Sequence, residues 1–361
     1  MSSLLYREDM DDVRKRLTAW WNGGDIGRPA MCLTAPRPEP LPTVPAMAEA
    51  PGWQTHYSTS NYDYRVNLAA RACADTHFLG EAVPTTTPDL APDCLALFLG
   101  CTGHETRGTV WCESFIHDAD PAVPDLHFDP ANFYWDFSLR LGREMLRLGR
   151  GRYLIQFPDL IEGLDTLAAI RGNQTLLVDL IERPDWVRKC LRRITDLYFH
   201  YYDILYDLYR DEVGGSCFWA WAPGRMTKLQ CDFSAMISPA MFGEFMVPVL
   251  AEMCQRVSYS LYHWDGPGAL PHLGHLLSIP ELTCIQWNPG AGVEEVLERK
   301  WWPLYHRIIE AGKRIFIYVL DDGAGLPALK REFGSGLKNF MIHCQLQDPA
   351  AAQKMIDSVT F

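Results

Sequence analysis

Residues 258–268, SYSLYHWDGPG, contain the pattern that decides the fold. Ser258–Asp265 is a mostly apolar and aromatic run of strand length, and Gly266-Pro267-Gly268 turns the chain directly after it. A helical pattern, Ala240–Arg256, comes just before this run. Short apolar strands that alternate with longer helices are typical of a buried parallel sheet.

Outward from this stretch, the same alternation recurs and becomes regular after residue 150. The other predicted strands are Ala30–Thr34, Val83–Pro88, Tyr153–Phe157, Ser216–Ala222, Cys284–Trp287, Arg314–Leu320 and Asn339–Cys344. The other predicted helices include 7–22, Gln174–Tyr206, Val293–Ala311 and Pro349–Val359. Eight strands with intervening helices favour an α/β fold of the (β/α)8 TIM-barrel type.

We expect one domain, residues 1–361, with an N-terminal helical and irregular extension and the first strands in 1–150 and regular βα repeats in 151–361. The Pro-rich run Pro36–Pro51 predicts a long irregular connection, and Gly108–Ile116 predicts strands that decorate the barrel. The alternative is a doubly wound open sheet, but no G-x-G-x-x-G motif follows an early strand.

The composition of the chain makes several classes of protein and of binding partner less favoured. Of 361 residues, 48% are hydrophobic and 22% are charged, which argues against disorder. The net charge of -12 disfavours partners with phosphate backbones or anionic lipid surfaces, so we expect neither nucleic-acid nor membrane binding. Eleven cysteines without a CxxC pair indicate reduced thiols, and no apolar stretch predicts a leader or a membrane span. The expected location is the cytoplasm.

Polar residues at predicted strand ends are candidates for chemistry, since active sites of such barrels lie at the C-terminal ends of strands. His263 and Asp265 are two positions apart and point to the same side of a strand. Cys344 ends the last strand, and imidazole, carboxylate and thiolate are all zinc ligands. The alternatives are a hydrogen-bonded His–Asp pair and a cysteine that fills the core.

Further carboxylates and aromatic residues are candidates for supporting roles. Asp232 lies in an uncharged run where Arg225 or Lys228 could be its partner, and the alternative is an N-cap or an ion pair. Asp159 and Asp165 lie near Arg171 and form either a buried acid–arginine bracket or a solvated ion pair. Four tryptophans and an asparagine at strand ends could line a substrate pocket, although aromatic residues also fill barrels. These are Trp219, Trp221, Trp264, Trp287 and Asn288.

The strand-end motifs together resemble the uroporphyrinogen decarboxylase superfamily, and specifically its corrinoid-dependent methyltransferase branch. The resemblance covers roughly residues 150–358. Its motifs are FPDLIEGLDTLAAIRG (157–172), LQCDFSAMISPAMFGEFMVPVL (229–250), YHWDGPGALPHLGHLL (262–277), IQWNPGAG (285–292) and MIHCQLQDPAAAQKMID (341–357). The decarboxylase branch fits less well, because its Arg-rich early segment corresponds here to GRPAMCLTAPRPEP (27–40).

The resemblance implies a distorted (β/α)8 barrel that holds zinc through a His-x-Cys pair and a distant cysteine. His263 and Cys344 match the first and last ligands, and Asp265 stands where the family has cysteine. A carboxylate ligand makes zinc harder and more Lewis-acidic, which puts the family's thiol activation in doubt. The resemblance also implies a corrinoid-binding partner protein that carries cobalamin, and it suggests a homodimer.

The sequence therefore predicts a zinc-dependent methyltransferase that moves a methyl group between a small heteroatom substrate and a corrinoid protein. Zinc lies on His263, Asp265 and Cys344, with Cys217, Asp321 or substrate as the fourth ligand. Asp159 and Asp232 orient the substrate or the ligands, and the strand-end tryptophans shape the pocket. Three alternatives remain: a metal-free lyase with Asp159 or Asp232 as the acid, a metal-dependent hydrolase, and a non-catalytic binding protein.

Overall fold

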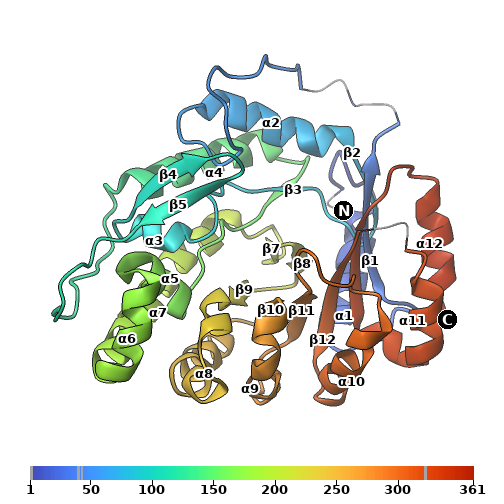
Figure 1. Cartoon of the computed structure of the whole chain (residues 1–361). Helices are drawn as coiled ribbons and strands as arrows, with labels where there is room; N and C mark the ends of the chain where they lie inside the picture. Colours follow the sequence, from blue (N-terminus) through green and yellow to red (C-terminus); the bar gives the residue numbers. More distant parts are fainter. Residues whose placement is uncertain (1–2, 39–40, 42–43, 321–322) are drawn as a thin grey trace.

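A seven-stranded sheet forms the centre of the protein in the computed structural model, which describes residues 3–38, 41, 44–320 and 323–361 (Figure 1). The strand order is β2-β1-β13-β12-β11-β10-β9, and every neighbouring pair is parallel except β1 and β2. The strands are β2 (Thr76–Gly80), β1 (Ala30–Pro36), β13 (Phe340–Gln345), β12 (Arg314–Val319), β11 (Cys284–Asn288), β10 (Tyr259–Asp265) and β9 (Met226–Gln230).

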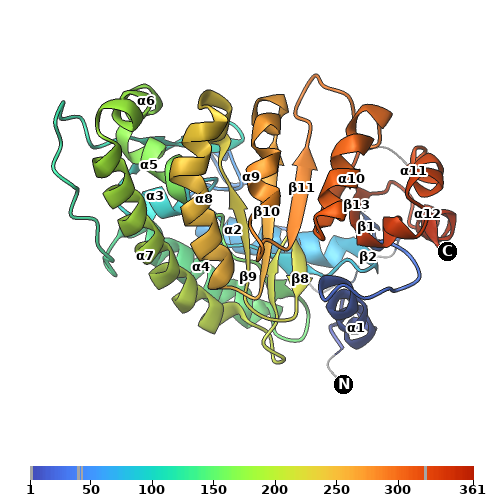
Figure 2. The ribbon, with the colours of Figure 1, turned by 90° about the horizontal axis from the view of Figure 1, so that it is seen from below.

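Helices cover the outer side of this sheet, and α7, α8, α9 and α10 stand side by side there (Figure 2). The helices are α1 (Met10–Trp21), α2 (Tyr62–Asp75), α3 (Cys94–Phe98), α4 (Phe133–Gly149), α5 (Gly163–Arg171), α6 (Asn173–Glu182), α7 (Pro184–Tyr209), α8 (Pro239–Gln255), α9 (Leu273–Leu277), α10 (Trp302–Glu310), α11 (Leu326–Phe333) and α12 (Ala351–Val359). Within the described part of the chain, no helix is both long enough and apolar enough to cross a bilayer.

The remaining strands form two-stranded pieces of their own. β3 (Thr85–Thr86) pairs with β6 (Leu154–Ile155), β7 (Ser216–Phe218) pairs with β8 (Ala220–Ala222), and β4 (Thr102–Thr106) pairs with β5 (Thr109–Glu113). The described strands thus form a mixed α/β structure in which the hydrogen-bonded ladders do not close into the predicted eight-stranded barrel.

Proline and one unusual turn explain why the ladders stay open. Pro84 and Pro88 flank β3, and Pro158 follows closely on β6. Proline has no N–H to donate, so these two strands are only two residues long. The predicted strand Ser216–Ala222 instead reverses at Trp219, whose φ of 57° lies in the left-handed region.

Two predicted helices also differ from the structure. The predicted helix Gln174–Tyr206 divides into α6 and α7, because Pro184 cannot continue a helix but fits the first turn of the next one. In the predicted helix Val293–Ala311, only the second half is α-helical, as α10.

The pleat of the sheet decides which side chains meet inside the molecule. His263 is level with Gln230 on β9 and with Gln286 on β11, and residues paired in this way point to the same face. We call this the inner face, because it carries the residues that contact Trp219. The outer face carries alternate residues such as Trp264, which pack under the helices and their connections.

Candidate metal centre

Three potential metal ligands meet at the inner face where β9 and β10 end. One ligand atom from each of Asp232, His263 and Asp265 lies within 4.8 Å of the others. His263 and Asp265 come from β10 at i and i+2, as the sequence predicts, and Asp232 begins the 3-10 helix η1 (Asp232–Met236) after β9. The sequence therefore identifies two members of this cluster as ligands and assigns the third, Asp232, a supporting role.

An amide on the neighbouring strand orients the imidazole of His263. Its Nδ1 lies 2.5 Å from Oε1 of Gln286, which is 2% exposed. An amide oxygen can only accept, so Nδ1 carries the proton and Nε2 keeps a lone pair for a ligand. A hydrogen bond from the second ring nitrogen is the usual support of a metal-binding histidine.

The two carboxylates have amide partners of their own. Asn288 Nδ2 donates to Oδ1 of Asp265 over 2.7 Å, and Gln230 Nε2 donates to Oδ2 of Asp232 over 3.1 Å. The predicted pocket residue Asn288 thus contacts the candidate ligand Asp265 directly. Each carboxylate keeps a second oxygen that neither of these bonds uses.

Asp165 fixes the turn that carries Asp232. Its two carboxylate oxygens accept from the backbone N–H groups of Asp232 and Phe233, each over 2.8 Å. Burial and then the charge of Asp232 raise the pKa of Asp165 to about 6. Burial also raises the pKa of Asp232, and the nearby charges of His263 and Lys228 oppose that rise. A cavity of about 430 Å³ opens beside these carboxyls.

Asp159 belongs to a buried ion pair next to the cluster. Lys228 Nζ lies 2.5 Å from Oδ1 of Asp159 and donates to Oε1 of Gln230 as well, and the lysine side chain is 1% exposed. Asp159 N–H donates to Oδ1 of Asp89 over 3.0 Å, and burial followed by the charge of Asp159 raises the pKa of Asp89 to about 6. Asp159 is therefore connected to Asp232 indirectly, through its ion pair with Lys228 and the hydrogen bonds of Gln230.

The bracket expected between Asp159, Asp165 and Arg171 is not formed. Arg171 instead makes a buried ion pair with Asp179, 2.7 Å from Nε to Oδ2. Arg225 likewise pairs with Asp203 at the surface and not with Asp232.

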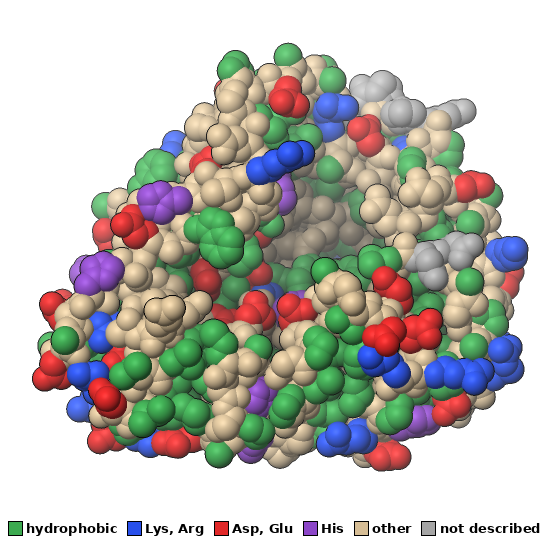
Figure 3. All heavy atoms as spheres, in the orientation of Figure 1, with side chains coloured by type: hydrophobic (Ala, Val, Ile, Leu, Met, Phe, Trp, Pro, Cys, Tyr) green, Lys and Arg blue, Asp and Glu red, His purple; other side chains and the backbone are tan. Residues whose placement is uncertain are grey.

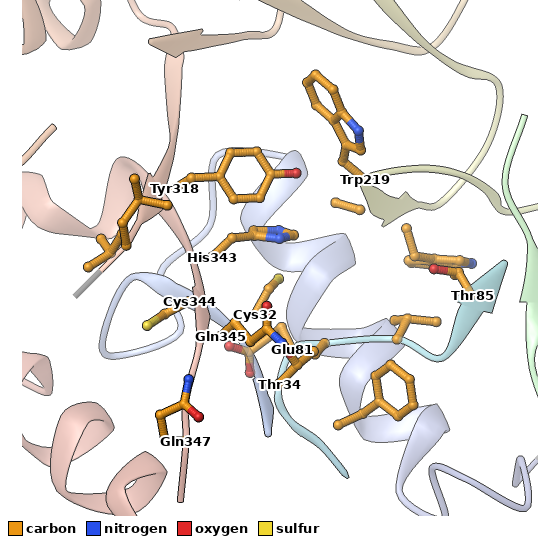
Figure 4. A pocket seen from close by; sticks show the side chains of 17 residues that line it. Cys32, Thr34, Glu81, Thr85, Trp219, Tyr318, His343, Cys344, Gln345 and Gln347 are labelled. Carbon is orange, nitrogen blue, oxygen red and sulfur yellow. The ribbon is translucent and has the colours of Figure 1, made fainter. Parts of the chain in front are cut away.

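Cys344 lies outside the cluster of ligand atoms among the described residues. It is level with Val319 and Leu33 on the adjacent strands, so it occupies the outer face of β13. His343 is the residue of this strand end that points inward, and the Cys344 sulfur is directed to the other side of the strand (Figure 4). The expected approach of Cys344 to His263 is therefore wrong, because the alternation of the strand turns the sulfur away.

The four tryptophans separate into two groups. Trp219 and Trp221 line a cavity of about 490 Å³. Trp264 and Trp287 are at most 1% exposed, and their tilted rings pack together in the outer core with centroids 4.6 Å apart. Trp287 also borders a small cavity beside Asn288. Asp321, a candidate fourth ligand, lies outside the described residues, as does Asp322. Cys217 is buried, and burial raises its pKa well above the usual range.

The donor set fits a divalent cation. For three atoms within 4.8 Å of one another, some point lies within about 2.8 Å of each, whereas zinc bonds to nitrogen and oxygen are roughly 2.0–2.2 Å. Shifts of under an ångström in three side chains would close that difference. One nitrogen and two carboxylate oxygens make a harder site than one with thiolates.

Several residues of the site are missed by sequence reasoning. Gln230 and Gln286 are amides inside otherwise apolar strands, and a buried amide in a strand is a usable signal of an oriented partner. His343 directly precedes the predicted ligand Cys344, and the apolar run that contains both does not reveal which of them points inward.

Comparisons with known proteins add a likeness of fold. Neither a scan of known protein families nor a search of curated proteins finds a match. Among solved structures, the chain is similar to a methyltransferase from Methanosarcina mazei, with a TM-score of 0.58 and 13% sequence identity. The match covers 96% of this chain and 97% of the other. At this identity the likeness concerns the fold along nearly the whole length.

Proposed function

We propose that this chain is a metal-dependent methyltransferase that moves a methyl group between the heteroatom of a small molecule and a corrinoid carried by a partner protein. The observation that carries the proposal is the cluster of Asp232, His263 and Asp265, in which every side chain is held by a neighbouring amide. The likeness in fold to a methyltransferase supports the reaction class.

In this proposal Asp232, His263 and Asp265 hold zinc, which when bound supplies a Lewis acid that polarises the bond between the heteroatom and its methyl group. Gln286 keeps Nδ1 of His263 protonated and directs the free lone pair of Nε2 toward the site. The indole of Trp219 meets the His263 ring edge-on at 5.5 Å and shields that side from water.

The carboxylates favour oxygen and nitrogen substrates over thiols, because two hard oxygen ligands replace the thiolates implied by the family resemblance. The surface is hollowed near the middle of the face shown in Figure 3, and acidic side chains gather along the lower rim. A corrinoid protein would have to present its cofactor at this opening.

Methyl transfer to free reduced cobalamin tests the proposal. A panel of methyl ethers and methylamines is offered to the zinc-loaded enzyme, and methylcobalamin is followed by its absorbance. The expected result is transfer from at least one donor, reduced at least about 100-fold in His263→Ala. An Ile181→Ala variant is the control, because Ile181 is 76% exposed and takes no part in the cluster. If no donor methylates cobalamin, or if His263→Ala is as active as the parent, the proposed function is wrong.

One observation favours a metal-free lyase as the second candidate. Asp89 has a pKa of about 6 and contacts Asp159, so a carboxyl that can donate a proton near neutral pH lies beside a carboxylate. A lyase of this kind would keep full activity after dialysis against a strong chelator, whereas the methyltransferase would lose it.

A further inference from the structure

A second cavity lies beside Trp219. It has a volume of about 490 Å³, within the range of small-molecule sites. Its wall combines the ends of β1, β12 and β13 with β3 and the turn between β7 and β8 (Figure 4). Trp219 lines this cavity and also contacts the His263 ring, so a molecule bound here would lie next to the proposed reaction centre.

The described lining of this cavity offers an ion no unpaired charge. It contains no lysine or arginine, and its one carboxylate, Glu81, accepts from Arg16 over 2.7 Å and from Arg28 over 2.6 Å. Burial lowers the pKa of His343 to about 3, so its imidazole is uncharged at neutral pH. An ion would enter without a counter-charge, and a neutral molecule would not need one.

Among the described residues, one buried polar atom on the wall of the cavity has no hydrogen-bond partner. Nε2 of His343 is buried and makes no hydrogen bond within the described residues. The rings of Phe316, at 4.3 Å, and Tyr318, at 5.3 Å, fix the plane of this imidazole. His343, Tyr318 and Trp219 all point into the same space (Figure 4). A buried polar atom without a partner is unfavourable until a ligand supplies the missing bond.

We propose that this cavity binds an uncharged, planar aromatic ring whose hydrogen-bonding substituent reaches Nε2 of His343. The faces of Trp219 and Tyr318 supply stacking surfaces, and the lining, which offers no unpaired charge, excludes carboxylates and ammonium ions. The identification of this ring as the body of the methylated substrate rests on the proposed function. Binding of the ring itself does not, since the cavity shares none of the three metal ligands.

Three ligands that share one ring system test this proposal by isothermal titration calorimetry on the full-length protein. They are neutral 2-naphthol, anionic 2-naphthoate and cationic 2-naphthylmethylammonium. We expect 2-naphthol to bind at least ten-fold more tightly than either ion. We also expect His343→Leu to weaken 2-naphthol at least five-fold and His343→Gln, which keeps a polar group, to restore most of the affinity. Trp111→Phe should leave the affinity unchanged.

Circular dichroism confirms the fold of each variant. If His343→Leu does not fold, Tyr318→Ala replaces it, and a loss of affinity is again expected because one stacking face is removed. Failure of 2-naphthol to bind would overturn the proposal. So would tighter binding of either ion, or an affinity that neither His343→Leu nor Tyr318→Ala reduces. Naphthol binding with no methyl transfer would leave the cavity assignment in place and reject only the methyltransferase.

Discussion

At the scale of single residues, the site depends on amides that hold charged or chelating side chains. Gln286 is the clearest case, because among the described residues it forms a hydrogen bond with His263 and with no other member of the cluster. Gln286→Leu should weaken zinc binding about 10- to 100-fold, as expected when the support of a metal-binding histidine is lost. Competition with a chromophoric chelator measures this change. Gln353→Leu, an exposed position on α12, should not alter it, and equal affinities in both variants would remove Gln286 from the account.

The ion pair of Lys228 and Asp159 is buried, so breaking it leaves an uncompensated charge. Lys228→Met should lower the free energy of unfolding by about 3 kcal/mol, measured by urea denaturation. Lys300→Met breaks an exposed pair with Glu294 and should cost under about 1 kcal/mol. Similar losses in the two variants would show that burial of Lys228 does not matter.

His343 should make the protein sensitive to acid. The folded protein holds this imidazole neutral down to about pH 3, whereas the unfolded chain takes up a proton below about pH 6.5. Its contribution to stability is therefore complete above pH 6.5 and is lost as the pH falls. The free energy of unfolding should fall between pH 7 and pH 5 in both proteins. The fall should be about 1–2 kcal/mol smaller in His343→Leu than in the parent. His127→Leu, at an exposed position, should follow the parent, and identical pH profiles for all three proteins would contradict this assignment.

The residue types at strand ends can be predicted from sequence, but the face of the sheet to which each side chain points is harder to predict. His263 and Asp265 share a face because their spacing of two is fixed by the strand itself. To predict where Cys344 points, one must know which alternate residues of its own strand, β13, face inward. An apolar run such as FMIHC gives no sign of which face is inner. Asp232 depends on the backbone cap of Asp165, a contact between positions 67 residues apart that no local pattern reveals.

At the scale of elements, the short helix η1 places Asp232, and Asp165 holds that helix at its start. Asp165→Ala should cost about 1–2 kcal/mol of stability, typical of a lost cap, and should also weaken zinc binding. Asp348→Ala removes a comparable carboxylate bond before α12, from Ala350 N–H, and should leave zinc binding unchanged. Thermal denaturation and chelator competition measure the two effects, and intact zinc affinity in Asp165→Ala would contradict this role.

Strands with continuous apolar runs are the elements that the sequence predicts well. β1, β10, β11, β12 and β13 lie close to their expected bounds, because buried parallel strands need apolar residues on both faces. β9, with the sequence MTKLQ, escapes prediction because Lys228 and Gln230 interrupt its apolar pattern. Those same polar residues are the ones that connect Asp159 to the metal cluster.

At the scale of the whole molecule, the α/β architecture follows from the alternation of strands and helices, whereas closure of a barrel does not. Closure needs long-range hydrogen bonds, and the proline-limited strands β3 and β6 do not provide them to the main sheet. The likeness in fold to a methyltransferase spans nearly the full chain. The inner face of the sheet then gathers distant residues around the candidate metal centre and the cavity beside Trp219.

The metal content of four proteins tests the central claim most directly. Parent, His263→Ala, Asp265→Ala and Cys344→Ala proteins are purified, loaded with zinc, desalted and analysed by inductively coupled plasma mass spectrometry. The account predicts about one zinc per chain in the parent and in Cys344→Ala, and almost none in the other two. Loss of zinc from Cys344→Ala with retention in Asp265→Ala, or a parent protein that binds no metal, would contradict it.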